Sequence, residues 1–306
     1  MGNFTPTTNA NAIPTVIAQE VLKLLPAQLG LAKFISRDVD WTGKDFANYG
    51  DTLTITRPGA LTVQTKTPNT PMTPQSPTAD KVSVTLDRHK YIDVLQEDIT
   101  KLLQKPDMQQ EYARNIAIKM AEEVESYFFG LHPSLTKTVT FDGTSATTIE
   151  NSFIKIRSQF MRLKVPQNET KFAFLDTSII DKLLTIDKYS RGDYIGNTEA
   201  VQLGAIRRIY NINIFESQLV PPTGSPVTYH NLAMTKYGMV LVNRPMPLDG
   251  NGRGVIQTNL VDPGTGLTMR LTESYSHGDL GVRFSMDVLY GGAVCDVNQV
   301  FEIEST

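Results

Sequence analysis

The sequence predicts an α+β fold, and the order of three kinds of segment supports this prediction. Apolar and polar residues alternate within residues 50–95 and again after residue 260, which is the period of half-exposed strands. Between these regions, apolar residues recur at helical spacing from about 106 to 130, and a mixed region covers about 148–246. Strand-rich and helical stretches therefore succeed one another without the regular alternation of a parallel α/β fold.

Composition limits the classes of protein to which the chain can belong. The chain has 306 residues, of which 40% are hydrophobic, enough to bury a core in one or two domains. A net charge of −3 argues against a dedicated nucleic-acid binder, which normally carries a basic excess. The single cysteine, Cys295, cannot form an internal disulfide, which agrees with assembly in the cytoplasm. Neither a signal peptide nor an apolar run of roughly 18 residues is present, so we expect a soluble protein without membrane contact.

The first residues predict an arm followed by a helix. Residues 1–11 are rich in Thr and Asn and contain too few apolar residues to fold alone. From Val16 to Leu29 the apolar residues lie close to helical spacing, which predicts an amphipathic helix ending near Gly30.

Residues 50–95 predict a projecting hairpin. The stretches 52–56 and 82–86 alternate like half-exposed strands, and prolines stand at 68, 71, 74 and 77 between them. A proline every third residue matches the repeat of polyproline II, which makes no internal hydrogen bonds. An isolated hairpin is marginally stable in water, so a neighbouring subunit is the expected support. A solvated linker, or a ligand for a proline-binding module, is the alternative interpretation.

A long helix is predicted to follow. Pro106 suits its first turn, Gly130 and Pro133 suit its end, and about 24 residues would span roughly 36 Å. Its apolar residues recur at every fourth position: Met108, Tyr112, Ile116, Met120, Val124 and Phe128. Glu122, Glu123 and Glu125 are assigned to the other face, where we interpret them as solvated rather than catalytic.

The rest of the chain predicts a mixed region and a closing β-rich region. A helix over about 153–163 is expected to be capped by Asn151 or Ser152, and Asp176 is expected to cap a short helix reaching Leu184. Strands are predicted at 171–175, 212–215, 239–242, 267–271 and 282–290, with a final run to Ile303.

No catalytic, cofactor-binding or metal-binding residue is predicted. His89, His132, His230 and His277 lack the spacings of zinc sites, and no second cysteine accompanies them. Ser276, His277 and Asp279 have triad residue types, but such close neighbours cannot face one another, so a turn is expected. Gly250–Gly254 lacks the Lys-Ser/Thr of a phosphate loop, and Arg191–Asp193 is interpreted as a turn rather than a receptor-adhesion motif.

Several motifs, in this order, resemble the major capsid proteins of tailed bacteriophages, which have the Hong Kong 97 capsid fold. The similarity is greatest to the branch of Salmonella-phage-type coat proteins. Gly50–Pro58 resembles the strand that opens the family's extended loop, and Val84–Asp87 with His89-Lys90 resembles the returning strand. Glu97–Thr100 with the helix from Pro106 resembles the start of the spine helix, and Asp287–Gly291 with Val294 resembles the closing strands.

The resemblance implies a domain organisation. Residues 1–45 would be the N-terminal arm, 46–100 the extended β-hairpin loop, 101–147 the peripheral domain with the spine helix, 148–255 the axial domain, and 256–306 the return strands of the peripheral domain. No long segment precedes the arm, so a separate scaffolding protein is expected. No room exists near 220–230 for the accessory domain that some coat proteins carry there.

The resemblance also implies function. We expect a non-enzymatic virion protein without cofactors that assembles in the host cytoplasm into pentamers and hexamers of an icosahedral head. Expected partners are the scaffolding protein, a portal protein, a decoration protein as a further candidate, and packaged double-stranded DNA touched without sequence preference. Two alternatives remain open: a tail-tube or head-completion protein, and a hydrolase that uses His230 or His277 with Asp279.

Overall fold

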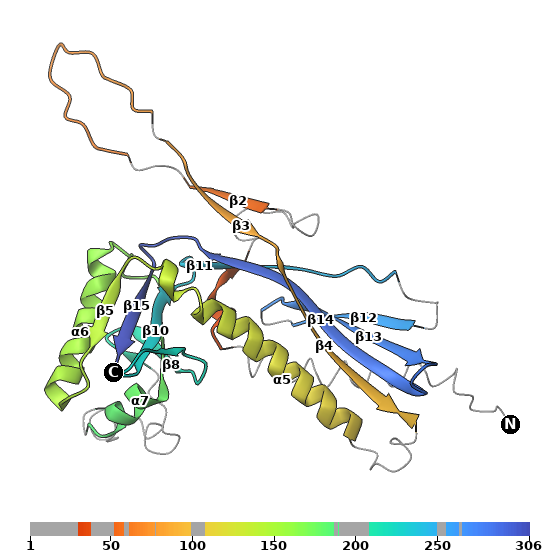
Figure 1. Ribbon diagram of the computed structural model, residues 1–306. Helices are drawn as coiled ribbons and strands as arrows, with labels where there is room; N and C mark the ends of the chain where they lie inside the picture. The colour runs from red at the N-terminus through yellow and green to blue at the C-terminus, as the bar shows by residue number, and fades with distance from the viewer. Residues whose placement is uncertain are drawn as a thin grey trace.

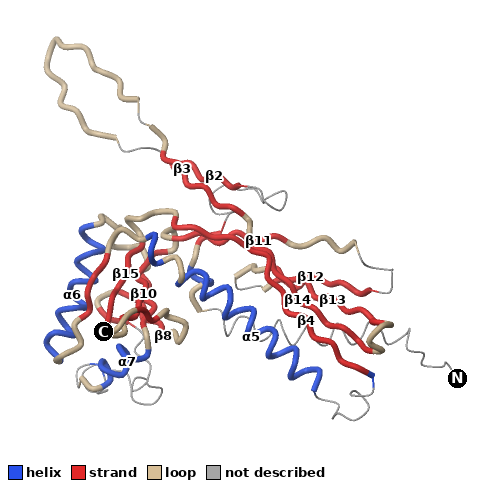
Figure 2. The backbone as a smooth tube through the Cα atoms, in the orientation of Figure 1, coloured by secondary structure: helices blue, strands red, loops and turns tan. Residues whose placement is uncertain are grey.

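The computed structural model describes residues 30–37, 52–57, 61–76, 78–98, 108–186, 189, 208–249, 255–262 and 265–306. The arm predicted over 1–11 and the helix predicted after it lie outside these residues. Two sheets and a long helix form the body, and a narrow hairpin projects from it (Figure 1). Figure 2 shows that strands dominate both parts of the body, which agrees with the predicted α+β class.

The first sheet is organised around one long strand, β14 (Gly281–Val294). Its first part pairs antiparallel with β4 (Arg88–Glu97) and with β13 (Thr268–Ser276), and its last residues pair with β11 (Met239–Arg244). Beyond these strands, β12 (Val255–Val261) pairs with β13, and β1 (Ser36–Arg37) pairs parallel to β11. The predicted strands at 239–242, 267–271 and 282–290 are confirmed, whereas β4 and β12 were not predicted.

The second sheet lies beside the C-terminal end of the long helix (Figure 1). Its described strands run in the order β5 (Thr138–Phe141), β15 (Val300–Ser305), β10 (Thr228–Thr235), β6 (Lys171–Leu175), β8 (Ile212–Glu216) and β7 (Arg208–Ile209), and β9 (Pro222–Thr223) pairs with β10. The strands predicted at 171–175 and 212–215 are confirmed. This sheet also contains β5 and β15, which lie outside the range 148–255 expected for the axial domain.

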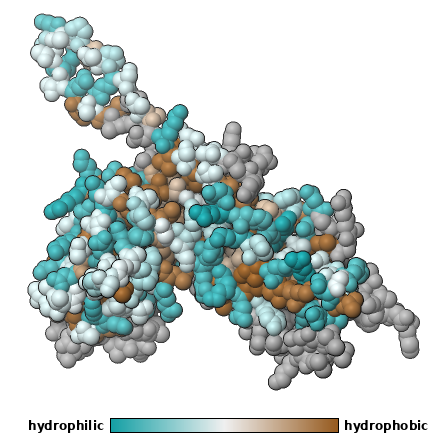
Figure 3. Space-filling view, viewed as in Figure 1, coloured by the Kyte–Doolittle hydropathy of each residue, from teal (hydrophilic) through white to brown (hydrophobic). Residues whose placement is uncertain are grey.

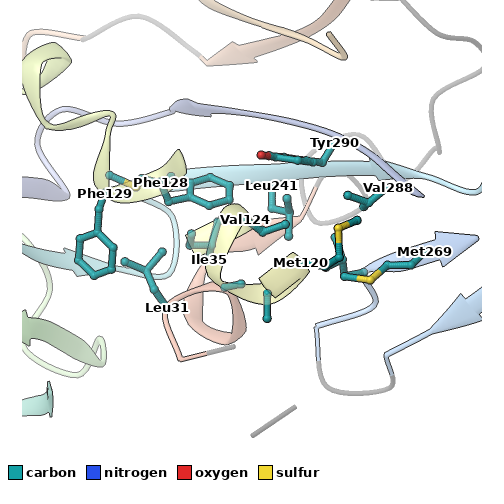
Figure 4. Close-up of a cluster of buried hydrophobic side chains, with 14 of the residues drawn as sticks. Leu31, Ile35, Met120, Val124, Phe128, Phe129, Leu241, Met269, Val288 and Tyr290 are labelled. Atoms are coloured by element: carbon teal, nitrogen blue, oxygen red, sulfur yellow. The ribbon is translucent and has the colours of Figure 1, made fainter. Parts of the chain in front are cut away.

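Helix α5 (Met108–Phe129) shares one hydrophobic core with residues of both sheets. Of its predicted apolar stripe, the residues from Ile116 to Phe128 are buried, while Tyr112 near the start is exposed. Figure 4 shows Met120 and Val124 facing Met269 and Val288 of the first sheet. The same core continues to the second sheet through Phe174, Leu232, Met234 and Val300. The helix ends at the predicted glycine, where the Gly130 backbone N–H donates to the Ser126 carbonyl at 2.9 Å.

Two further helices cover the opposite face of the second sheet. Helix α6 (Ala146–Arg162) and helix α7 (Thr177–Leu184) bury Phe153, Phe160 and Ile179 in a second core with Phe301. Asp176 caps α7 as predicted, because its carboxylate accepts from the Ser178 N–H at 2.9 Å.

The cap predicted for α6 is wrong. The helix starts earlier than Asn151 or Ser152, at Ser145, whose side chain accepts from the Thr148 N–H while the Thr148 hydroxyl accepts from the Ser145 N–H. Ser152 is buried inside the helix, and its hydroxyl donates to the Thr148 carbonyl at 2.8 Å.

The predicted hairpin is formed by β2 (Thr52–Arg57) and β3 (Asp80–Thr85), which pair antiparallel. The base of the hairpin packs against the body of its own subunit, and not only against a neighbour. Ile55, Val84 and Leu86 are buried in a third apolar cluster with Val240, Val242, Leu289 and Cys295 of the body. The described end of the range assigned to the arm also packs within its own subunit, because Leu31, Ala32 and Ile35 lie in the core around α5.

Gly291 marks the closest approach of the hairpin base to the first sheet. A Cβ added there would lie 2.3 Å from the Thr85 carbonyl oxygen, and backbone at that position has little freedom to move. We expect Gly291→Ala to lower the free energy of unfolding by about 1–3 kcal/mol, the usual cost of overpacking. Gly278→Ala is the matched control, because a Cβ there meets no atom within 4 Å. Urea denaturation of the two variants would test this, and equal stability would contradict it.

Candidate assembly surface and polar clusters

The hairpin tip (residues 61–76) is exposed along its whole length (Figure 3). Three large apolar side chains lie on it: Val63 is fully exposed, and Leu61 and Met72 are largely exposed. The two sides of the tip meet at Gln75, whose side-chain oxygen accepts from the Thr62 N–H at 3.0 Å. A tip with exposed apolar groups and no core of its own is typical of a segment that binds another surface.

The outer face of the first sheet carries a network of paired charges. Arg270 donates to both carboxylate oxygens of Asp287, at 3.0 and 2.9 Å, and His89 Nε2 lies 2.9 Å from one of those oxygens. Arg283 Nε donates to Asp93 at 2.9 Å on the same face. Bidentate arginine–carboxylate pairs are directional, so these contacts hold β4, β13 and β14 in register.

Glu125 corrects the interpretation of the α5 carboxylates. Glu122 and Glu123 form ion pairs at 2.6 Å with Lys119 and at 2.8 Å with Lys90, but Glu125 is buried. Its carboxylate accepts from the Leu31 N–H at 2.7 Å, because the end of the arm packs on this side of the helix. Burial raises the pKa of the Glu125 carboxyl from 4.5 to about 7, although the backbone hydrogen bonds oppose that rise.

The candidate triad around His277 forms the turn that the sequence predicts. The Ser276 hydroxyl donates to the Asp279 carboxylate at 2.7 Å, and the His277 ring contacts the ring of Tyr275, with centroids 5.2 Å apart. These residues connect β13 to β14. The Gly250–Gly254 and Arg191–Asp193 segments lie outside the described residues.

The four histidines are far apart in the sequence, but the structure brings two of them together. His132 and His230 stack with ring centroids 4.0 Å apart, and both approach the buried carboxylate of Glu302. Their spacing could not signal this cluster, because His230 and Glu302 are 72 residues apart and meet only through the pairing of β10 with β15.

Among the described residues, none of the helices is both long and apolar enough to cross a membrane.

Comparisons of sequence and of structure gave different results. No family model and no curated protein matches the sequence. The fold is similar to a structure from Mycobacterium phage Che8, with a TM-score of 0.68 and 16% identity over 90% of this chain and 91% of that one. The capsid of cyanophage P-SCSP1u gives a TM-score of 0.65 at 11% identity, covering 90% of this chain and 86% of the other.

A third structure extends the likeness. The mature capsid of bacteriophage PhiM1 gives a TM-score of 0.59 at 13% identity, covering 83% of this chain and 82% of the other. These likenesses extend over most of the chain, and they confirm the expected Hong Kong 97-like fold.

Proposed function

We propose that this chain is the major capsid protein of a tailed double-stranded DNA phage and assembles into its icosahedral head. The observation that carries the proposal is the exposed apolar hairpin tip projecting from a body with a phage capsid fold. The tip is exposed in its own subunit, whereas in a shell it can cover a neighbour.

The proposed mechanism is assembly by contacts between unlike surfaces of identical subunits. A contact of this kind closes into a ring when its rotation closes, and rings of five and six subunits can build a shell. Each tip would lie on an adjacent subunit and bury the side chains of Leu61, Val63 and Met72. In this proposal the first sheet with α5 forms the peripheral domain, and the second sheet with α6 and α7 forms the axial domain.

The proposed partners follow from the shell. A separate scaffolding protein would guide assembly, a portal protein would occupy one vertex, and a decoration protein is a further candidate on the outside. The protein would reside in the virion after assembly in the host cytoplasm. Its net charge of −3 suits non-specific contact with packaged DNA, because a basic shell would bind the genome through counterion release.

Two alternative functions make different predictions. A tail-tube or head-completion protein would form tubes or small rings instead of closed shells. A hydrolase would need His230 or His277 to act with Asp279, yet His230 contacts Glu302 and Asp279 accepts from Ser276. The proposed function is therefore structural, without a catalytic role.

Negative-stain electron microscopy tests the proposal. We expect the purified protein, alone or mixed with the proteins of a phage lysate, to form closed polyhedral particles. Size-exclusion chromatography with light scattering would give the mass of the same particles. Tubes, isolated rings or a permanent monomer under all these conditions would contradict a role as the main shell protein.

A further inference from the structure

Three side chains with metal-ligand chemistry meet where the end of α5 reaches the second sheet. His132 opens the short 3-10 turn His132–Ser134, His230 lies on β10, and Glu302 lies on β15. The Nδ1 atom of His132 is 3.2 Å from Oε1 of Glu302, and Nδ1 of His230 contacts the same oxygen. One ligand atom from each residue lies within 4.8 Å of the other two.

The backbone positions all three residues. In the antiparallel pair of β10 and β15, Leu232 is opposite Glu302 and His230 is opposite Glu304, so these side chains share one face. Leu232 belongs to the core around α5, so this is the face toward the helix. His132 approaches the same face because it follows α5 after only two residues. The cluster therefore lies on rigid elements.

The cluster is largely shielded from solvent. Glu302 and His230 are buried, and the His132 side chain is mostly covered. Burial, and then the neighbouring His230, lower the pKa of the His132 imidazole. The second ring nitrogen of His230, Nε2, contacts the Thr223 hydroxyl. A contact to this outer ring nitrogen fixes the direction of the imidazole ring, which is how outer contacts orient histidine ligands.

We propose that His132, His230 and Glu302 form a binding site for a divalent transition metal of the zinc class. Two imidazole nitrogens and one carboxylate oxygen are a donor set that zinc uses, with bonds of about 2.0–2.2 Å. A tetrahedral arrangement of such bonds separates neighbouring ligand atoms by about 3.3 Å. The His132–Glu302 contact is 3.2 Å, and the closer His230–Glu302 contact would have to lengthen when the metal binds. Mg²⁺ and Ca²⁺ prefer all-oxygen sites, so this set selects against them.

The metal would join parts of the chain that are distant in sequence. It would fasten the turn after α5 to the paired strands β10 and β15, with Glu304 or a water as the fourth ligand. Binding to the folded state alone stabilises that state, so the site would strengthen the attachment of this turn to the second sheet. This inference does not depend on the proposed assembly function.

Titration calorimetry with Zn²⁺ on the full chain, purified with chelator and without a histidine tag, tests the site. We expect one Zn²⁺ per chain and no heat from Mg²⁺. His132→Ala, His230→Ala and Glu302→Gln should each weaken Zn²⁺ binding by at least about tenfold. His277→Ala is the matched control and should bind as the unaltered protein does, because that histidine lies in the β13–β14 turn.

Three further measurements distinguish a loss of metal binding from a loss of folding. Circular dichroism would establish that each variant is folded, and Co²⁺ absorption would report coordination by nitrogen and oxygen directly. Zn²⁺ should also raise the melting temperature of the unaltered protein but not of His230→Ala. The proposal is overturned if the unaltered protein binds neither metal, or if the three site variants bind Zn²⁺ as tightly as His277→Ala.

Discussion

Deleting residues 66–79 is expected to leave a folded subunit that no longer forms closed shells. The deletion removes most of the hairpin tip, including Met72, but leaves the paired strands β2 and β3 and the buried residues of the hairpin base. The subunit core is therefore untouched, while most of the tip proposed to cover a neighbour is lost. Light scattering would measure assembly, and urea denaturation would measure the stability of the subunit.

A same-length replacement separates the shape of the tip from its chemistry. Exchanging residues 66–79 for a Gly/Ser sequence keeps the chain length but removes Met72 and the regularly spaced prolines. Flexible Gly/Ser segments lose more entropy on ordering, so this variant should also assemble poorly. Normal particles from the deletion variant would contradict the role given to the tip. A large loss of subunit stability would instead show that the tip supports its own fold.

Replacing Glu125 by Gln is expected to stabilise the subunit above neutral pH and to remove a pH dependence. The pKa of Glu125 is raised from 4.5 to about 7 in the folded state. Between these values the unfolded chain has released the proton while the folded chain retains it, so stability falls as pH rises through this window. The shift corresponds to about 3 kcal/mol, lost by about pH 7 and constant above it.

The glutamine variant keeps the contact that Glu125 makes. Its amide oxygen can still accept from the Leu31 N–H, but no charge has to be buried. Urea denaturation at about pH 5 and about pH 8 should show a smaller difference for Glu125→Gln than for the unaltered protein. Glu123→Gln is the control, because Glu123 is partly exposed and paired with Lys90. An identical pH dependence for Glu125→Gln and the unaltered protein would refute the assignment.

Elements with a strong local pattern could be predicted from the sequence. The pairing of β2 with β3 confirms the strands predicted from the alternation at 52–56 and 82–86. This signal is local, because strand period and register depend on residues that are neighbours in the sequence. The end of the long helix at Gly130 and the cap at Asp176 are likewise local signals. The cap of α6 was misplaced because Ser145, Asn151 and Ser152 are all good capping residues, and only the fold selects one.

Features created by distant residues could not be predicted in this way. Strand β4 has a mixed polar sequence, and its position depends on ten paired residues of β14. Glu125 is buried against the residues around Leu31, and helical periodicity alone does not encode this contact. The cluster of His132, His230 and Glu302 likewise requires the register of β10 with β15. Tertiary contacts override local pattern at these three places.

A cryo-electron microscopy reconstruction of purified particles tests the central claim most directly. The account predicts closed shells with fivefold and sixfold positions, in which each hairpin tip lies on an adjacent subunit and Leu61, Val63 and Met72 are covered. Closed shells with the tips free in solvent would contradict the assembly mechanism. Particles built as tubes or single rings would contradict the proposed function itself.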